Sequence, residues 1–202
     1  MTLERKRKTK DPCFDCGLHK DLCLCHLIPS LDLKTKLVLV IHHRELKRTS
    51  NTGRLALKSL KNSEMRVRGL KDAGPLDLSD LLTPNYRTLL FFPSDEAREL
   101  TPTLVSESPL PIQLIVPDGN WRQASKVAIR HPELRHLERV MISTPNTSTQ
   151  HLRAEHFEEG MSTLQAIALA FAATEDDEVG NQLLQLYKEK LNRTLKARGQ
   201  LA

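Results

Sequence analysis

The 202-residue chain lacks several features that assign proteins to common classes. It has no apolar run long enough to span a bilayer, so we expect no membrane partner. Its basic residues 5–8 lead into cysteines instead of the apolar core of a signal peptide. It also has no internal repeat, no glycine-rich phosphate loop and no nucleophile elbow. We therefore expect a soluble, intracellular, cytoplasmic protein whose chemistry rests on another pattern.

Positive charge is concentrated in one part of the chain. The formal net charge is +5, but residues 34–71 hold eleven Lys or Arg against two acids, whereas residues 72–107 are net acidic. Residues 1–10 are too polar to fold and are predicted to form a disordered basic arm. A basic half favours a polyanionic partner, with RNA or DNA ahead of a membrane surface, and a solvated lysine-rich surface is the alternative.

All four cysteines lie within thirteen residues, as Cys13-x2-Cys16-x6-Cys23-x-Cys25. In a reducing compartment such a cluster indicates a metal site ahead of two disulfides. Four thiolates suit a structural, tetrahedral zinc ion and leave no open position for a catalytic water. We therefore predict a zinc knuckle at residues 11–30. A redox pair and an iron–sulfur site are the alternatives, and His19 and His26 are possible substitute ligands.

Alternating apolar runs and helical patterns predict an α/β domain with a parallel sheet and helices on both faces. Strands are expected near residues 37–41, 65–67, 87–92, 112–116 and 139–142, and helices near residues 55–60, 78–82, 121–130, 164–173 and 175–196. Ser94, followed by two acids, also predicts a helix start. Because parallel strands end on one edge of a sheet, the polar loops near Pro93, Asp118 and Ser162 should meet there.

The most informative stretch covers residues 114–126, where an apolar strand ends at Pro117. Asp118 and Gly119 form the tip, and the only Trp of the chain, Trp121, opens the next helix. A lone carboxylate at a strand end, beside a glycine that allows close backbone approach, favours a catalytic site. Pro-Asp-Gly is also among the commonest turn sequences, so a plain turn is the alternative.

A second polar cluster begins at His42, where the first strand ends. Asn51 or Thr52 can cap the helix that follows. Open N–H groups at a helix start, beside Arg48 and Arg54, suit an anion such as an RNA phosphate. Ordinary capping with exposed charges is the alternative.

Several further motifs follow one another over nearly the whole chain: the four cysteines, His42 with Glu45, residues 50–55, Pro93, residues 118–126, Leu152 with Arg153, and residues 162–166. In the order and spacing of these motifs, the chain resembles the DTW-domain family of tRNA-uridine aminocarboxypropyltransferases. Three positions depart from the family pattern. Asn120 stands where Thr is usual, Gln165 where Glu is common, and His43 where Pro is usual. We expect the Asp118 loop to survive with Asn120, whereas Gln165 removes a charge near the donor site.

The resemblance implies a SPOUT-like domain at residues 31–175 with a knotted C-terminal region, followed by an amphipathic helix and tail at residues 176–202. It implies transfer of the 3-amino-3-carboxypropyl group of S-adenosylmethionine to N3 of a uridine in tRNA. Knotted relatives are often dimers, so a homodimer and a monomer are both open. An RNA methyltransferase, a non-catalytic zinc-containing RNA-binding protein and a different acceptor nucleoside are the functional alternatives.

The resemblance also implies roles for individual residues. Asp118 is the expected general base, or the group that orients the uridine N3–H. Trp121 stacks on adenine or uracil, or else is a buried anchor between helix and sheet. Donor binding is expected at Phe92, Pro93, Ser94, Pro117, Gly119, Trp121, Leu152, Ser162 and Thr163. Contacts with tRNA are expected at His42, Arg48, Asn51, Thr52, Gly53, Arg54 and Lys126.

Overall fold

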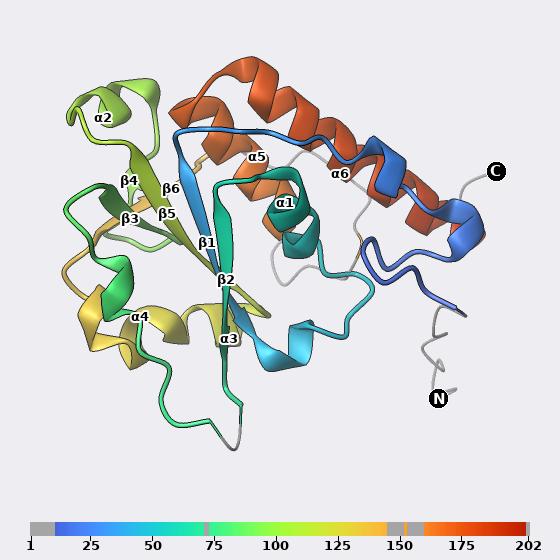
Figure 1. Ribbon diagram of the computed structural model, residues 1–202, viewed down its shortest axis with the longest axis horizontal. Coiled ribbons are helices and arrows are strands. Elements are labelled where there is room, and N and C mark those ends of the chain that lie inside the picture. Colours follow the sequence, from blue (N-terminus) through green and yellow to red (C-terminus); the bar gives the residue numbers. More distant parts are fainter. Residues whose placement is uncertain (1–10, 71–72, 145–151, 153–159, 201–202) are drawn as a thin grey trace.

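A six-stranded sheet forms the centre of the computed structural model, which describes residues 11–70, 73–144, 152 and 160–200 (Figure 1). The strand order is β2-β1-β5-β3-β6-β4, and every pairing is parallel. The strands are β1 (Lys36–His42), β2 (Ser63–Arg68), β3 (Arg87–Phe91), β4 (Arg98–Glu99), β5 (Ile112–Asp118) and β6 (Glu138–Met141). The predicted α/β fold is confirmed at this level, and the predicted basic arm lies outside the described residues.

The sheet is buried on both faces because apolar side chains fill both sides of its central strands. In β1, Leu37, Leu39 and Ile41 belong to one core layer, and Val38 and Val40 belong to the other. A strand buried on both sides has no polar face, which is why β1 is a continuous apolar run in the sequence.

Helices α1 (Gly53–Ser59), α5 (Thr163–Thr174) and α6 (Asp177–Ala197) cover the first face, with α2 (Pro102–Ser106) against α5 (Figure 1). Helix α6 lies very close to α5 at Gly180, where a Cβ atom would stand 2.5 Å from the Cβ of Ala172. A larger residue at this position would force the two helices apart. Within the described ranges, no helix is both long and apolar enough to cross a bilayer.

The second face is covered by shorter elements. These are α4 (Lys126–Arg130) and the 3-10 turns η4 (Ser79–Leu81) and η5 (Pro132–Leu134). Leu81, Val127 and Leu134 fill this layer against the sheet. The helix predicted at residues 121–130 is interrupted at Ser125, so that a separate α3 (Trp121–Ala124) precedes α4. The remaining 3-10 turns are η1 (Lys20–Leu22), η2 (Cys25–Leu27) and η3 (His43–Glu45).

The helix predicted to start at Ser94 is wrong. A single turn forms there, in which the Ala97 N–H donates to the Ser94 carbonyl at 2.9 Å. The next residues pair with β6 instead, and the following helix begins after Thr101, whose side chain accepts from the Leu104 N–H. A capping pattern is local, and pairing with the edge of a sheet overrides it.

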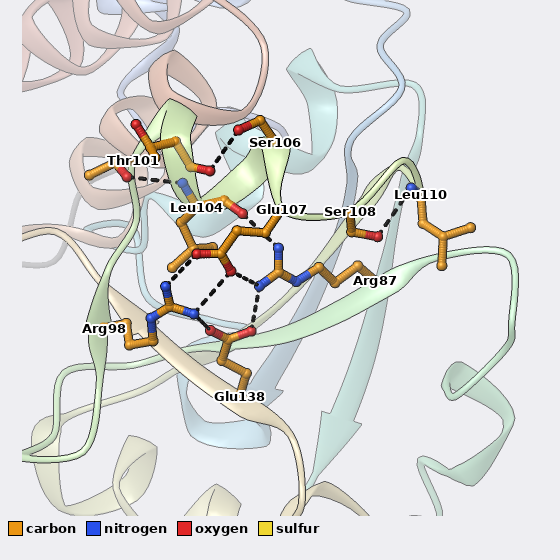
Figure 2. Close-up of polar contacts among 10 residues, drawn as sticks. Arg87, Arg98, Thr101, Leu104, Ser106, Glu107, Ser108, Leu110 and Glu138 are labelled. Carbon is orange, nitrogen blue, oxygen red and sulfur yellow. Dashed lines mark hydrogen bonds and ion pairs between the residues drawn. The ribbon is translucent and has the colours of Figure 1, made fainter.

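An ion-pair network joins the first residues of β3, β4 and β6 to Glu107, which follows α2 (Figure 2). Arg98 contacts Glu107 and Glu138, each at 2.6 Å. Arg87 contacts the same two carboxylates at 3.0 and 2.7 Å. The hydrogen bonds from Arg98 and Arg87 lower the pKa of Glu107 to about 2. Each acid is shared by both arginines, so the network fastens the edge strand β4 to the sheet.

We expect Glu107→Gln to change how the stability depends on pH. The pKa of Glu107 is about 2 in the folded chain, against an ordinary value of 4.5. Its contribution to the free energy of unfolding is therefore complete above pH 4.5 and is lost as the pH falls toward 2. The difference in urea midpoint between wild type and variant should therefore be constant above pH 4.5 and should shrink below it. As a control, Glu96→Gln breaks only the exposed pair with Arg139 and should change the midpoint little. Parallel midpoint curves for wild type and Glu107→Gln would contradict the assignment.

Candidate active site and metal centre

Asp118, the last residue of β5, is 3% exposed and accepts hydrogen bonds from two distant segments. The Asn51 Nδ2 donates to its Oδ2 at 2.6 Å, and the Thr163 Oγ1 donates to its Oδ1 at 2.6 Å. Asn51 lies in the loop before α1, and Thr163 is the first residue of α5. Short hydrogen bonds to both oxygens hold the carboxylate in one orientation. The loops predicted to meet near Asp118 and Ser162 therefore do meet.

The loop before α1 fits closely around this carboxylate. Asn51 also accepts from a backbone N–H in the first turn of α1 at 3.2 Å, and Thr52 Oγ1 accepts from the Leu164 N–H at 3.1 Å. A Cβ atom at Gly53 would stand 3.0 Å from Oδ2 of Asp118, so glycine permits this approach of α1. The structure thus places Asn51, Thr52 and Gly53 in a buried position against Asp118, and their contact with tRNA stays a prediction.

The turn that follows Asp118 is closed by a capping box. The Asn120 side chain accepts from the Gln123 N–H at 2.9 Å, and the Gln123 side chain accepts from the Asn120 N–H at 2.9 Å. Asn is among the best N-cap residues, so it suits this position in place of the usual Thr. A Cβ atom at Gly119 would stand 2.9 Å from the Cβ of Gln123, so the close turn also uses this glycine. The expectation that the loop survives with Asn120 is confirmed.

Two aromatic side chains from neighbouring strand ends lie together at this edge of the sheet. The ring centroids of Phe92, just after β3, and Trp121, at the start of α3, are 5.0 Å apart. Trp121 is 44% exposed, so the alternative that it is a buried anchor is wrong. A tilted and partly exposed aromatic pair offers a surface on which a planar base can stack.

Ser94 and Ser162, two of the predicted donor-binding residues, differ in their environment. The Ser94 Oγ is buried, and among the described residues it has no hydrogen-bond partner. This hydroxyl is therefore available to form a hydrogen bond with a bound ligand. Ser162 instead caps α5, because its Oγ accepts from the Gln165 N–H at 3.3 Å. Since Thr52 also takes the Leu164 N–H, groups of the protein itself already occupy two of the first N–H groups of α5. This helix start is less open to a carboxylate than the sequence implied. Pro93, between Phe92 and Ser94, is exposed.

Leu152 and Pro117 contribute to the core of the molecule. Leu152 is 4% exposed and belongs to the first core layer, and its carbonyl accepts from the Arg198 Nη2 at 2.8 Å. Pro117 is buried in β5 opposite Val40 of β1. Because both side chains are buried in the core, only the backbone atoms of these residues can contact the donor. Arg153 lies outside the described residues.

His42 and Arg68 lie side by side at the carboxyl ends of β1 and β2. Burial, followed by the charge of Arg68, lowers the pKa of His42 below its usual value, which favours the neutral imidazole. Arg68 is 5% exposed and donates to the carbonyl of Gln123, so it holds α3 against the sheet. No local pattern in the sequence indicates this role of Arg68, because its burial depends on where α3 packs.

The other predicted tRNA contacts are Arg48, Arg54 and Lys126. The Nε of Arg48, a half-exposed residue, pairs with the buried Glu45 at 3.1 Å. The Arg54 Nη2 donates to the Phe14 carbonyl at 2.5 Å, and its guanidinium lies 5.3 Å from the Phe14 ring centroid. Arg54 is therefore engaged with the cysteine-rich segment. Lys126, the first residue of α4, is half-buried.

The four cysteines form a compact cluster whose sulfur atoms all lie within 4.8 Å of one another. Cys13 Sγ lies 3.6 Å from Cys25 Sγ and 3.7 Å from Cys23 Sγ, and the Cys16 and Cys23 sulfur atoms are 3.9 Å apart. Tetrahedral zinc with Zn–S bonds of about 2.3 Å requires sulfur separations of about 3.8 Å. The cluster therefore has the spacing of a four-thiolate metal site, and the set found in the described residues uses neither His19 nor His26.

The thiols of the cluster differ in acidity. Hydrogen bonding from the Cys16 backbone lowers the pKa of Cys13 to about 6, whereas burial raises the pKa of Cys16 and of Cys25. A divalent ion at the centre would supply the positive charge that converts all four to thiolates.

Sequence comparison identifies the family. The model of the DTW domain matches residues 10–195, which is almost the entire chain. The chain belongs to the DTW domain family. No solved structure matches it.

Curated relatives of this DTW domain carry one functional name. It is similar to tRNA-uridine aminocarboxypropyltransferase 2 of Macaca fascicularis, with 25% identity over 173 residues that cover 83% of this chain and 58% of that protein. It is also similar to tRNA-uridine aminocarboxypropyltransferase A of Arabidopsis thaliana, with 26% identity over 208 residues that cover 88% of this chain and 78% of that protein. The chain spans little more than half the length of the macaque protein and of its mouse counterpart.

Proposed function

We propose that this protein transfers the 3-amino-3-carboxypropyl group of S-adenosylmethionine to N3 of a uridine in tRNA. The observation that carries the proposal is the buried Asp118 carboxylate, oriented by Asn51 and Thr163 at the carboxyl end of a parallel strand. The functional name shared by the relatives and the basic character of residues 34–71 also support it.

The reaction needs positioning and one proton acceptor. The uridine N3–H gives up its proton, N3 forms a bond to the γ-carbon of the donor, and the electron pair of the broken C–S bond leaves with methylthioadenosine. We assign one of two roles to Asp118: it accepts this proton as general base, or it orients the N3–H group. Each of the three carbons on the sulfonium is electrophilic, so the site selects one of them by geometry.

The residues around Asp118 suit the two substrates. The Phe92–Trp121 pair offers a stacking surface for adenine or uracil, and the Ser94 hydroxyl offers a hydrogen bond to the donor. His42 lies on the β1–β2 side of Asp118, where the acceptor uridine would enter. Arg48 and Lys126 are left for tRNA phosphates.

We also propose that the cysteine cluster holds a structural zinc ion and that the C-terminal region is knotted, as the SPOUT-like resemblance implies. The sulfur spacing supports the first proposal. Residues 145–151 and 153–159 of the C-terminal region lie outside the described residues. An experimental structure whose chain does not pass through a loop in this region would refute the knot.

The decisive test is mass spectrometry of nucleosides from tRNA incubated with the purified protein and S-adenosylmethionine, with separate detection of the by-product. We expect an aminocarboxypropyl uridine together with methylthioadenosine. A methylated nucleoside with S-adenosylhomocysteine would indicate a methyltransferase. Tight tRNA binding without any product would indicate a binding protein, and a modified nucleoside other than uridine would change the acceptor.

Thr163→Val should lower kcat in this assay about tenfold, because it removes one charge-assisted hydrogen bond to Asp118 worth about 1.5 kcal/mol. The variant keeps the shape of the side chain, and the cap of α5 comes from Ser162, so the melting temperature should fall by no more than about 5 °C and the protein should stay folded. Thr163→Ser retains the hydroxyl and should stay close to wild type. Equal rates for the Val variant and wild type would show that the Thr163 hydrogen bond is not used.

A further inference from the structure

A buried lysine joins the metal cluster to the loop that orients Asp118. Lys190 of α6 is 1% exposed, and its Nζ donates to the Cys16 carbonyl at 2.5 Å and to the Thr49 carbonyl at 3.0 Å. Cys16 belongs to the cysteine cluster proposed to hold zinc, and Thr49 lies two residues before Asn51. Among the described residues no carboxylate pairs with Lys190, so its partners are these two carbonyl groups.

A buried ammonium group is costly unless a negative charge compensates it. Four thiolates around a divalent ion carry a net negative charge, and the Cys16 carbonyl places the ammonium beside them. The loaded cluster therefore supplies the compensation that the described carboxylates do not. Lys190 therefore links the cysteine cluster to the loop, because its second hydrogen bond is donated to the Thr49 carbonyl.

The cysteine-rich segment also touches this loop directly. Gly17 has a φ of +69°, and a Cβ atom on it would stand 3.0 Å from both the Cα and the carbonyl oxygen of Thr49. On the neighbouring helix α1, Arg54 donates to the Phe14 carbonyl, and the Lys58 Nζ pairs with Asp15 at 2.8 Å. The cysteine-rich segment thus packs against both the loop and α1. At Thr49 the backbone of the segment lies directly against the backbone of the loop.

The position of Thr49 affects the Asp118 carboxylate through the hydrogen bonds of the loop. The Asn51 N–H donates to the Arg48 carbonyl at 3.1 Å in a turn that includes Thr49, and the Asn51 side chain donates to Asp118 at 2.6 Å. A shift of the Thr49 backbone therefore moves the donor that orients Asp118. Misplacement of a catalytic group by about 1 Å can lower a rate about 10²-fold.

We propose that Lys190 is a positioning residue through which the metal cluster fixes the Thr49–Asn51 turn and thereby the orientation of Asp118. The inference rests on the role proposed for Asp118, which the Asp118→Asn variant tests by itself. Lys190 touches neither substrate in this proposal. Its loss should alter turnover and the mobility of the loop, and it should leave binding of S-adenosylmethionine unchanged.

The test compares Lys190→Met with Arg193→Met in the full-length, zinc-loaded protein. Arg193 is the matched control, since it lies one turn along α6 and donates to the Cys23 carbonyl at 2.5 Å, but it contacts the cluster without reaching the loop. Zinc content, hydrogen exchange of peptides spanning residues 46–54, and kcat and KM for both substrates are measured on each variant.

We expect Lys190→Met to keep its zinc, to show about tenfold faster hydrogen exchange in residues 46–54 and to lose about tenfold in kcat, with the KM for S-adenosylmethionine within about twofold of wild type. Arg193→Met should leave exchange in the loop and kcat unchanged. The proposal is wrong if Lys190→Met matches wild type in exchange and kcat, or if both variants change the loop equally. Should Lys190→Met fail to fold, Gly17→Ala is tested in its place, because its added Cβ would press on the Thr49 backbone. This variant must give the same loop-specific pattern, and wild-type exchange and kcat would overturn the proposal.

Discussion

Replacing Asp118 by Asn should lower kcat for formation of the aminocarboxypropyl uridine about 10³-fold, with the protein still folded. Asn has the size of Asp but cannot accept the N3 proton. Its amide must also turn one N–H group toward Asn51, where the hydrogen bond is lost, or toward Thr163, whose hydroxyl must then accept instead of donate, so the two charge-assisted hydrogen bonds at 2.6 Å are not both retained. The measurement is product formation under saturating substrates, together with the melting temperature.

A neighbouring substitution serves as the control for Asp118→Asn. Asn120→Thr keeps an N-cap residue at the start of α3 and restores the residue that is usual in the DTW family, so activity should be retained. If Asp118→Asn keeps the wild-type kcat, Asp118 is not the base. If only KM rises, the carboxylate positions the uridine in the ground state and takes no part in proton transfer.

Removal of the metal should have the second largest effect. Cys25→Ser replaces a thiolate ligand by a poor one, so we expect loss of bound zinc and unfolding of residues 13–25. That would expose Leu18 and Leu24, which are 4% and 0% exposed, at about 2 kcal/mol each. A loss of about 4 kcal/mol corresponds to a fall of about 10 °C in the melting temperature of a chain of this length.

Metal analysis and thermal unfolding of the same preparations test this expectation. His26→Ala is the matched control, because His26 is exposed and outside the sulfur cluster, and it should retain both zinc and stability. Iron in place of zinc would indicate an iron–sulfur site. A Cys25→Ser protein with full metal content and unchanged melting temperature would show that the cluster is not a four-thiolate site.

Every strand except the short edge strand β4, together with the cysteine cluster, was predictable from the sequence because these signals are local. Residues 37–41 are apolar without interruption and residues 112–116 are interrupted only by Gln113, as expected for strands covered on both faces, and both segments form central strands. Four cysteines within thirteen residues can reach one another with little help from the remainder of the chain. Local signals failed at Ser94, where a capping pattern lost to pairing of the next residues with β6.

Much of the candidate site depended on contacts that no local pattern contains. The sequence placed Asp118 at a strand end, but its partners lie 67 residues before it and 45 residues after it. The sequence predicted Asn51 as a helix cap and a tRNA contact, and only the fold shows that its amide donates to Asp118. No role was predicted for Arg68 or Lys190, because a charged residue becomes buried only where another element of the fold covers it.

The sequence by itself determined the chemistry available to this protein: a carboxylate at the end of an apolar strand, four clustered thiols and a basic segment. The tertiary structure decided which groups act on one another. It brought Asn51 and Thr163 to Asp118, and Lys190 to both the Cys16 and the Thr49 carbonyls. The physical reason is that periodicity and capping are encoded over a few residues. A hydrogen bond between distant residues exists only once the packing of α1, α5 and α6 on the sheet has fixed both partners.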